Sequence, residues 1–333
     1  IQTRADDLRR AISWCIANID VETLMPPLRR YLGYLRAWGW FKAGLATIEL
    51  ALQRDDLGPV LSAELHRYAA EAMLHAGKID EATRTLERGL ACVGSRIPNG
   101  SARRRVWNAE QAAVLSVSPL GRASAEKKQR AAERARLMSL LGEVFYVSER
   151  RAEMISYSLG SLAAGRQSRE PLLIASGDAA ISVAAQLSGA HGVSERYRKR
   201  ARDRLKDAAS QDPFTATMAW GVTALVAAGA GQWADARKDC AASIGAARAS
   251  GRARIVTPTE IRLALLDCHE GKAKNALARL HDIEREIERN GFRRGLTWVY
   301  ATRAEAAYRI HDFALARGAA QDALRTANEH GRP

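Results

Sequence analysis

The side chains that most often carry chemistry are scattered along this sequence rather than grouped. The four cysteines, Cys15, Cys92, Cys240 and Cys268, lie far apart and form no CxxC pair. Structural zinc sites and disulfide frameworks need close and regular cysteine spacing. We therefore expect no metal site and no disulfide, and we expect the chain to reside in the cytoplasm, where thiols stay reduced.

The histidines and the acidic clusters also lack a catalytic pattern. His66 and His75 are nine residues apart, and Cys268 and His269 are adjacent, so neither pair shares a helix face at ligand spacing. His330 stands near the end of the chain. The sequence contains no GxxxxGK[ST] loop, no GxGxxG motif and no GxSxG elbow. It therefore predicts no enzymatic activity, no metal and no cofactor.

Composition narrows the fold class. The 333 residues carry a formal charge of +14, and 47% are apolar but only 6% aromatic, with alanine prominent. The apolar share is large enough for a packed core, which excludes a disordered chain. Abundant alanine and few β-branched runs argue against a β-rich fold. The uncharged stretch 213–234 contains threonines and glycines, so we interpret it as a buried helix and not as a membrane span. The chain begins with Ile1 rather than Met, so we expect it to be part of a longer polypeptide.

A period of about 40 residues runs through most of the chain. Similar six-residue segments recur at 77–82, 231–236, 271–276 and 311–316, and alanine-rich helical sequence flanks each of them. We call the last residue of each segment an anchor, and three further positions at the same spacing complete the set. The anchors are Ala43, Ala82, Met154, Ser194, Ala236, Ala276 and Ala316, with gaps of 39, 72, 40, 42, 40 and 40 residues. One irregular gap indicates a repeat array with a single insertion.

The residues around each anchor have a steric role. Six of the seven residues twelve positions before the anchors are small, which lets two helices of a hairpin approach closely. Glycine occupies the position five before four anchors, where the chain must turn and a positive φ is needed. Three positions before the anchor, a bulky residue can cover the end of the hairpin: Trp40, Ile79, Trp233 or Phe313.

This pattern resembles the tetratricopeptide repeat, in which two antiparallel helices cross at small residues. The resemblance covers about 28–328. It implies an all-α solenoid of about seven antiparallel helix hairpins. We expect N-terminal repeats over 1–94, a basic insertion with an extra helix over 95–125, and C-terminal repeats over 126–333. Within the insertion, a helix is expected over 102–117, followed by a break at 119–121.

Positive charge is concentrated in two runs. Residues 96–136 hold ten basic and three acidic side chains, and residues 193–207 hold seven basic and three acidic ones. Such runs attract nucleic acid phosphates or acidic proteins, or are solvated helix surface. The few aromatics among them make nucleic acid the less favoured partner. The candidate basic patch comprises Arg103, Arg104, Arg105, Lys127, Lys128, Arg198, Lys199 and Arg200.

Two further stretches, 131–148 and 187–201, resemble the C-terminal repeat region of large bacterial signalling proteins. In those proteins, a nucleotide cyclase or kinase domain and a P-loop ATPase precede tetratricopeptide-like repeats, and the MalT-type transcriptional activators are a related case. The resemblance implies a regulatory arm, fused to or associated with a cyclase or ATPase module. Catalytic residues of such families have no counterparts in this sequence.

Tetratricopeptide geometry also indicates the surface on which a partner would bind. The first helix of each hairpin lines a concave groove in such solenoids. The candidate groove residues are Arg67, Glu71, Glu143, Tyr146, Gln186, Trp298, Glu305 and Tyr308, and packing between repeats is the alternative role for each. The sequence thus predicts a non-catalytic scaffold or sensor that binds a protein or peptide. The alternatives are a small-inducer-binding arm of a transcriptional regulator and a helical repeat that associates with nucleic acid. The oligomeric state stays open.

Overall fold

The computed structural model describes residues 2–38, 41–98, 100–116, 123–209, 212–249, 256–290 and 294–329. Within these ranges the regular structure is entirely helical, as the sequence predicted. The chain forms two compact units, 1–97 and 98–333. The expected turn residue Trp40, the break at 119–121 and His330 lie outside the described residues.

The described residues of the first unit form five helices. Their bounds are α1 Gln2–Asn18, α2 Val21–Trp38, α3 Phe41–Leu52, α4 Pro59–His75 and α5 Ile79–Cys92. Its core brings together apolar side chains from the first four helices, including Ile12, Leu28, Ile48 and Leu65. Helix α4 begins with proline at its first position, where the missing N–H costs no helical hydrogen bond.

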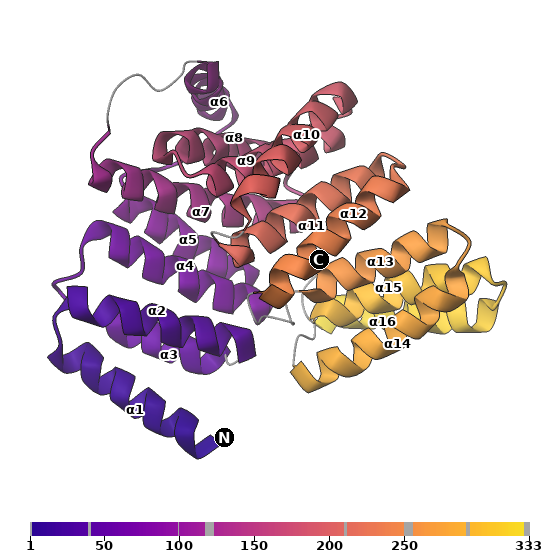
Figure 1. Cartoon of the computed structure of the whole chain (residues 1–333), viewed down its shortest axis with the longest axis horizontal. Coiled ribbons are helices and arrows are strands. Elements are labelled where there is room, and N and C mark those ends of the chain that lie inside the picture. Colours follow the sequence, from indigo (N-terminus) through magenta and orange to yellow (C-terminus); the bar gives the residue numbers. More distant parts are fainter. Residues whose placement is uncertain are drawn as a thin grey trace. The chain divides into compact units, whose positions relative to one another are not determined.

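The second unit contains eleven helices among its described residues. Their bounds are α6 Ser101–Ser116, α7 Ala125–Val147, α8 Arg151–Ser168, α9 Pro171–Leu187, α10 His191–Ala208, α11 Pro213–Gly229, α12 Trp233–Ala249, α13 Thr257–His269, α14 Ala273–Asn290, α15 Arg294–Arg309 and α16 Phe313–Glu329. From α7 onward they form successive antiparallel hairpins, α7/α8 to α15/α16 (Figure 1). With α2/α3 and α4/α5, the described residues form the seven hairpins that the anchors predicted.

The hairpin turns share one backbone conformation. In four hairpins, the residue five positions before the anchor is a glycine. Its φ is 77° at Gly77, 76° at Gly189, 72° at Gly231 and 77° at Gly271. This left-handed conformation favours glycine because it has no Cβ. Glu149, with a φ of 57°, and His311, with a φ of 62°, take the same conformation at the same register position. The conformation therefore belongs to the hairpin and not to the residue type.

Close helix contacts depend on small residues, both at the anchors and at positions outside the predicted register. A Cβ added to Gly177 of α9 would lie 2.7 Å from Cα of Leu162 in α8. A Cβ added to Gly165 would lie 3.1 Å from the backbone of Leu173. Ala236 and Ala276, two of the anchors, are fully buried. The hairpins stack at distances that larger side chains would prevent.

Helix α6 lies outside the hairpin series and packs on α8. It has no buried residue, yet the indole of its Trp107 occupies the space that a Cβ on Gly160 of α8 would need. Arg104 forms an ion pair of 3.3 Å with Glu153 of α8, and Arg166 of α8 donates to the carbonyl oxygen of Leu115. A helix therefore lies close to the range expected for it, held by one aromatic and two arginine contacts.

The first helices of the hairpins in the second unit form a layer, which we call the inner layer: α7, α9, α11, α13 and α15. Each packs against the next in the series. The second helices α8, α10, α12 and α14 show no comparable packing against one another among the described residues, and each instead packs on the following first helix. An array whose first helices approach one another more closely than its second helices is curved, with the inner layer on its concave side.

No helix within the described ranges combines the length and the apolarity that crossing a membrane requires. The uncharged stretch considered above forms α11, the turn after it and the start of α12, and Trp220 and Ala224 of α11 are buried among neighbouring helices.

Candidate functional site

The two candidate groove residues of the first unit form an ion pair with each other. Arg67 and Glu71 lie one turn apart on α4, and the Arg67 guanidinium is 3.1 Å from the Glu71 carboxylate. Both side chains are buried, and the Arg67 guanidinium also lies over the ring of Tyr68. Neighbouring Glu64 accepts two hydrogen bonds from Arg29 of α2, of 2.7 and 2.6 Å. Packing between helices is therefore a clear role for this part of the candidate groove.

In the second unit, the inner layer exposes several of the predicted residues. Glu143 and Tyr146 are exposed near the end of α7. Gln186 is half-buried near the end of α9, where its Oε1 lies 3.3 Å from Nδ1 of His191. Met218 of α11 is exposed as well. The layer thus offers aromatic, apolar and amide groups to a ligand.

The last inner helix contributes three further candidates. On α15, Trp298 and Glu305 are half-buried. Tyr308 is 61% exposed, and its ring meets that of Phe313 edge-on at 5.9 Å between centroids. Glu305 accepts a hydrogen bond of 2.7 Å from Arg309. An exposed tyrosine fixed by a neighbouring ring is a typical anchor for a protein partner, because it buries a large area at a low cost in entropy.

The basic run around α6 is partly available to a partner. Arg103, Arg105 and Lys127 are exposed, and Lys128 is half-buried. Arg104 differs, because its guanidinium is directed to Glu153 of α8. Binding of a partner by the exposed residues Arg103, Arg105 and Lys127 therefore stays a prediction.

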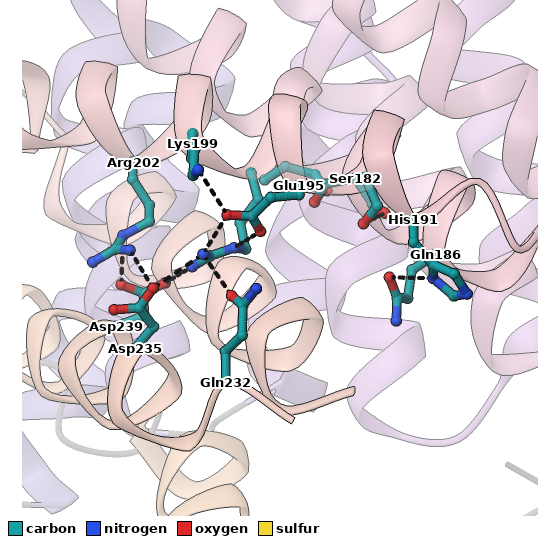
Figure 2. A network of polar contacts seen from close by, with 12 residues as sticks. Ser182, Gln186, His191, Glu195, Lys199, Arg202, Gln232, Asp235 and Asp239 are labelled. Atoms are coloured by element: carbon teal, nitrogen blue, oxygen red, sulfur yellow. Dashed lines mark hydrogen bonds and ion pairs between the residues drawn. The ribbon is translucent and has the colours of Figure 1, made fainter. Parts of the chain in front are cut away.

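Arg198 of α10 lies within the protein and not on a basic surface. Its side chain is 1% exposed, and its guanidinium donates to Glu195 at 2.8 Å, to Gln232 at 2.7 Å and to Asp235 at 3.1 Å. Figure 2 shows these three partners: Glu195 of α10, Asp235 of α12 and Gln232, which directly precedes α12. The expectation that Arg198 belongs to an exposed patch is therefore corrected: its charge is used to join two successive hairpins.

The carboxylates around Arg198 respond to it in opposite ways. Hydrogen bonds from Arg198 lower the pKa of Glu195 and of Asp235. Asp239 is buried, and this burial raises its pKa even though Arg198 and Arg202 lie nearby, with Arg202 at 3.0 Å (Figure 2). A buried charge must be paired to be tolerated, so this network specifies how α10 meets α12.

The remaining two basic candidates of α10 also face carboxylates. Lys199 is exposed and lies 3.5 Å from Glu195. Arg200 lies 3.4 Å from the fully buried Asp178 of α9, which Arg204 also contacts at 2.5 Å. Burial raises the pKa of Asp178, and the arginines oppose that effect.

Comparable bridges recur further along the array. Arg237 of α12 pairs with Asp267 and with Glu270 at the following hairpin, the latter at 2.7 Å. Arg303 of α15 pairs with Glu284 of α14. Several arginines of this basic chain thus form ion pairs between neighbouring helices. Composition alone does not distinguish such structural arginines from arginines that bind an anion.

Two arginines of the inner layer have neutral partners, and the sequence analysis missed both. Arg134 of α7 donates to the side-chain oxygen of Gln167 in α8, and Arg262 of α13 donates to a backbone carbonyl. Arg262 of α13 is half-buried, and its NH1 donates to the carbonyl oxygen of Gly221 in α11 at 2.6 Å. Among the described residues, no carboxylate lies within ion-pair distance of its guanidinium. Burial lowers its pKa. No spacing rule could have found it, because its partner is the backbone carbonyl of Gly221 on a different helix.

The described part of the chain contains no group of three or more His, Cys, Asp or Glu side chains that could hold a metal ion. Cys240 and Cys268 are fully buried, and this burial raises the pKa of each thiol to about 11. Thiols in that state are poor nucleophiles.

Comparisons with known proteins bear on the fold. No family model and no curated protein matches the chain. Among solved structures, it is similar to the Rap conjugation gene regulator of the plasmid pLS20 in complex with the Phr* peptide, with 13% identity and a TM-score of 0.56 over 90% of this chain and 73% of that one. The chains share a fold. A second similar structure is a Rap protein complexed with competence and sporulation factor, with 8% identity and a TM-score of 0.53 over 98% and 99% of the two chains.

These likenesses support the helical-repeat solenoid and not the more specific resemblance drawn from 131–148 and 187–201. Neither structure is described as a cyclase, an ATPase or a MalT-type activator. Association with such a module therefore stays a prediction from the sequence.

Proposed function

We propose that this chain is a non-catalytic regulatory protein of the cytoplasm that binds a protein or peptide partner on the inner layer of its second unit. The observation that carries the proposal is the set of exposed large side chains on first helices, above all Tyr146 and Tyr308. Aromatic side chains that become buried against a partner supply much of the affinity in protein interfaces.

The solved structures are consistent with this proposal. Both similar chains were determined as complexes, one with the Phr* peptide and the other with competence and sporulation factor. A curved array of hairpins presents one continuous concave surface, which suits an extended or helical peptide better than a compact small molecule. Glu143, Gln186, Trp298 and Glu305 would supply polar and aromatic contacts on the same layer.

The exposed residues Arg103 and Arg105 are the remaining basis for an acidic partner or nucleic acid. The buried state of Arg198 and the ion pairs of Arg104 and Arg200 reduce the exposed charge available to either. We therefore favour the inner layer.

The proposal is tested by quantitative capture of partners from the native cell extract. The double variant Tyr146→Ser/Tyr308→Ser should lose the captured partner, because two aromatic anchors are removed from the inner layer. Leu324→Ser is the matched control: Leu324 is 67% exposed but lies on the second helix α16. Equal capture by both variants would contradict the proposal.

A further inference from the structure

Arg262 differs from several arginines that join helices of the second unit through ion pairs. Arg198, Arg237 and Arg303 each meet at least one carboxylate. Arg262 instead gives a single described hydrogen bond, to the neutral carbonyl oxygen of Gly221. A guanidinium has five N–H donors, so most of its donor capacity is left for another acceptor.

The surroundings of Arg262 are polar on the side of the neighbouring helices. The space above Gly221 is bordered by the hydroxyl of Thr259 on α13, by that of Ser243 on α12 and by NH1 of Arg262 itself. The two hydroxyl oxygens lie 3.2 Å apart. A Cβ added to Gly221 would lie 3.7 Å from the Thr259 hydroxyl and 3.8 Å from both the Ser243 hydroxyl and NH1 of Arg262, so these three polar groups converge on one point beside α11.

Tyr146 ties this position to the proposed binding surface. The Tyr146 hydroxyl on α7 is among the groups that interact electrostatically with the Arg262 guanidinium, although two inner helices, α9 and α11, lie between α7 and α13 in the series. The other such group is Cys240, whose thiol is neutral because its pKa is about 11. Among the described residues, no carboxylate therefore compensates the positive charge of Arg262, and the desolvation that lowers its pKa is a cost that an anionic ligand would offset.

We propose that Arg262 is the anion-binding residue of the inner layer and that it receives a carboxylate of the bound peptide. This inference rests on the proposed function, because it names the ligand group that the inner layer recognises. A planar carboxylate matches the donor fork of a guanidinium, and the half-buried position makes that pair stronger than a surface ion pair. Either the terminal carboxylate of a peptide or an Asp or Glu side chain has this chemistry.

The test uses the full chain labelled with ¹⁵N-arginine and the simplest probes, acetate and its neutral isostere acetamide. The Nε–Hε resonance of Arg262, assigned by its absence in Arg262→Gln, should shift saturably with acetate, and acetamide should bind at least about tenfold more weakly. Arg279→Gln is the matched control, because Arg279 on α14 already pairs with Asp267 at 3.4 Å. This control should bind acetate as the wild type does.

N-acetylleucine and the α-amide of N-acetylaspartate then distinguish the two sources of the carboxylate, and tighter binding of either supports the proposal. An acetate response that acetamide reproduces, or that persists at other arginines while Arg262 is silent, overturns it. If acetate does not bind Arg262 but the Tyr146→Ser/Tyr308→Ser variant still loses its partner, the anion site is refuted and the proposed function stands. Arg262→Met should leave the urea midpoint of the ligand-free chain unchanged or higher, whereas a large decrease would show that Arg262 is structural.

Discussion

The left-handed turn residue of each hairpin makes a quantitative prediction at Glu149. Six turns place the residue five before the anchor at positive φ, and four of them use glycine. A left-handed conformation costs an ordinary residue about 1–2 kcal/mol. Compared with alanine, glycine also lowers the free energy of unfolding by about 0.4–1 kcal/mol, because it gives the unfolded chain more conformational freedom. Glu149→Gly should therefore stabilise the chain by roughly 0.5–1 kcal/mol.

The same reasoning predicts the opposite effect at Gly189, which has the same register position and a φ of 76°. An added Cβ there meets no atom within 4 Å, so Gly189→Ala measures backbone strain without a clash and should cost roughly 0.5–1 kcal/mol. The assay is urea unfolding followed by circular dichroism, with midpoints compared at equal slope.

Glu149→Ala is the control for loss of the exposed carboxylate, and it should change the stability by less than about 0.5 kcal/mol. If Glu149→Gly were no more stable than Glu149→Ala, the turn conformation would not be the cause of the glycine pattern, and the argument from register would be refuted.

Other consequences follow from the packing and the ion pairs. Gly177→Ala should destabilise the chain by about 1–3 kcal/mol in urea unfolding, because its Cβ would stand 2.7 Å from Cα of Leu162, whereas Gly245→Ala, which meets nothing within 4 Å, should not destabilise it. Ala236→Trp or Ala276→Trp should abolish cooperative unfolding of the repeats, and a retained wild-type midpoint would contradict the packing at the anchors. Arg198→Gln should cost about 3 kcal/mol or more, because it leaves Asp239 buried without one of its two arginines, and Lys199→Gln, an exposed neighbour, should cost little. The pKa of Glu270 should be about 2 in an NMR titration, and Arg237→Gln should return it toward 4.5. Because that pKa is lowered on folding, the stabilisation by this pair is present above pH 4.5 and is lost as the pH falls toward 2.

The sequence predicted the fold well because the repeats impose the same steric demand many times. Small anchors such as Ala236 and turn glycines such as Gly231 appear wherever two helices must meet or reverse, and a period of about 40 residues survives substitution at single positions. Glu149 and His311 show the limit of that reading, since the conformation persists where glycine is replaced.

The candidate site was less predictable, because charge and exposure depend on contacts between distant segments. Arg198 and Lys199 are neighbours in one basic run, yet the first is buried among carboxylates of α12 and the second is exposed. Arg262 carries no motif, since its environment is set by Gly221, 41 residues earlier on a different helix. Helix periodicity alone cannot place a side chain relative to a separate hairpin.

Site-specific photo-crosslinking in native cells tests the central claim most directly. A photoreactive phenylalanine analogue placed at position 308, on inner helix α15, should capture a discrete protein or peptide, and the same analogue at position 324, on α16, should not. Capture of one partner from position 324 with none from position 308 would contradict binding on the inner layer.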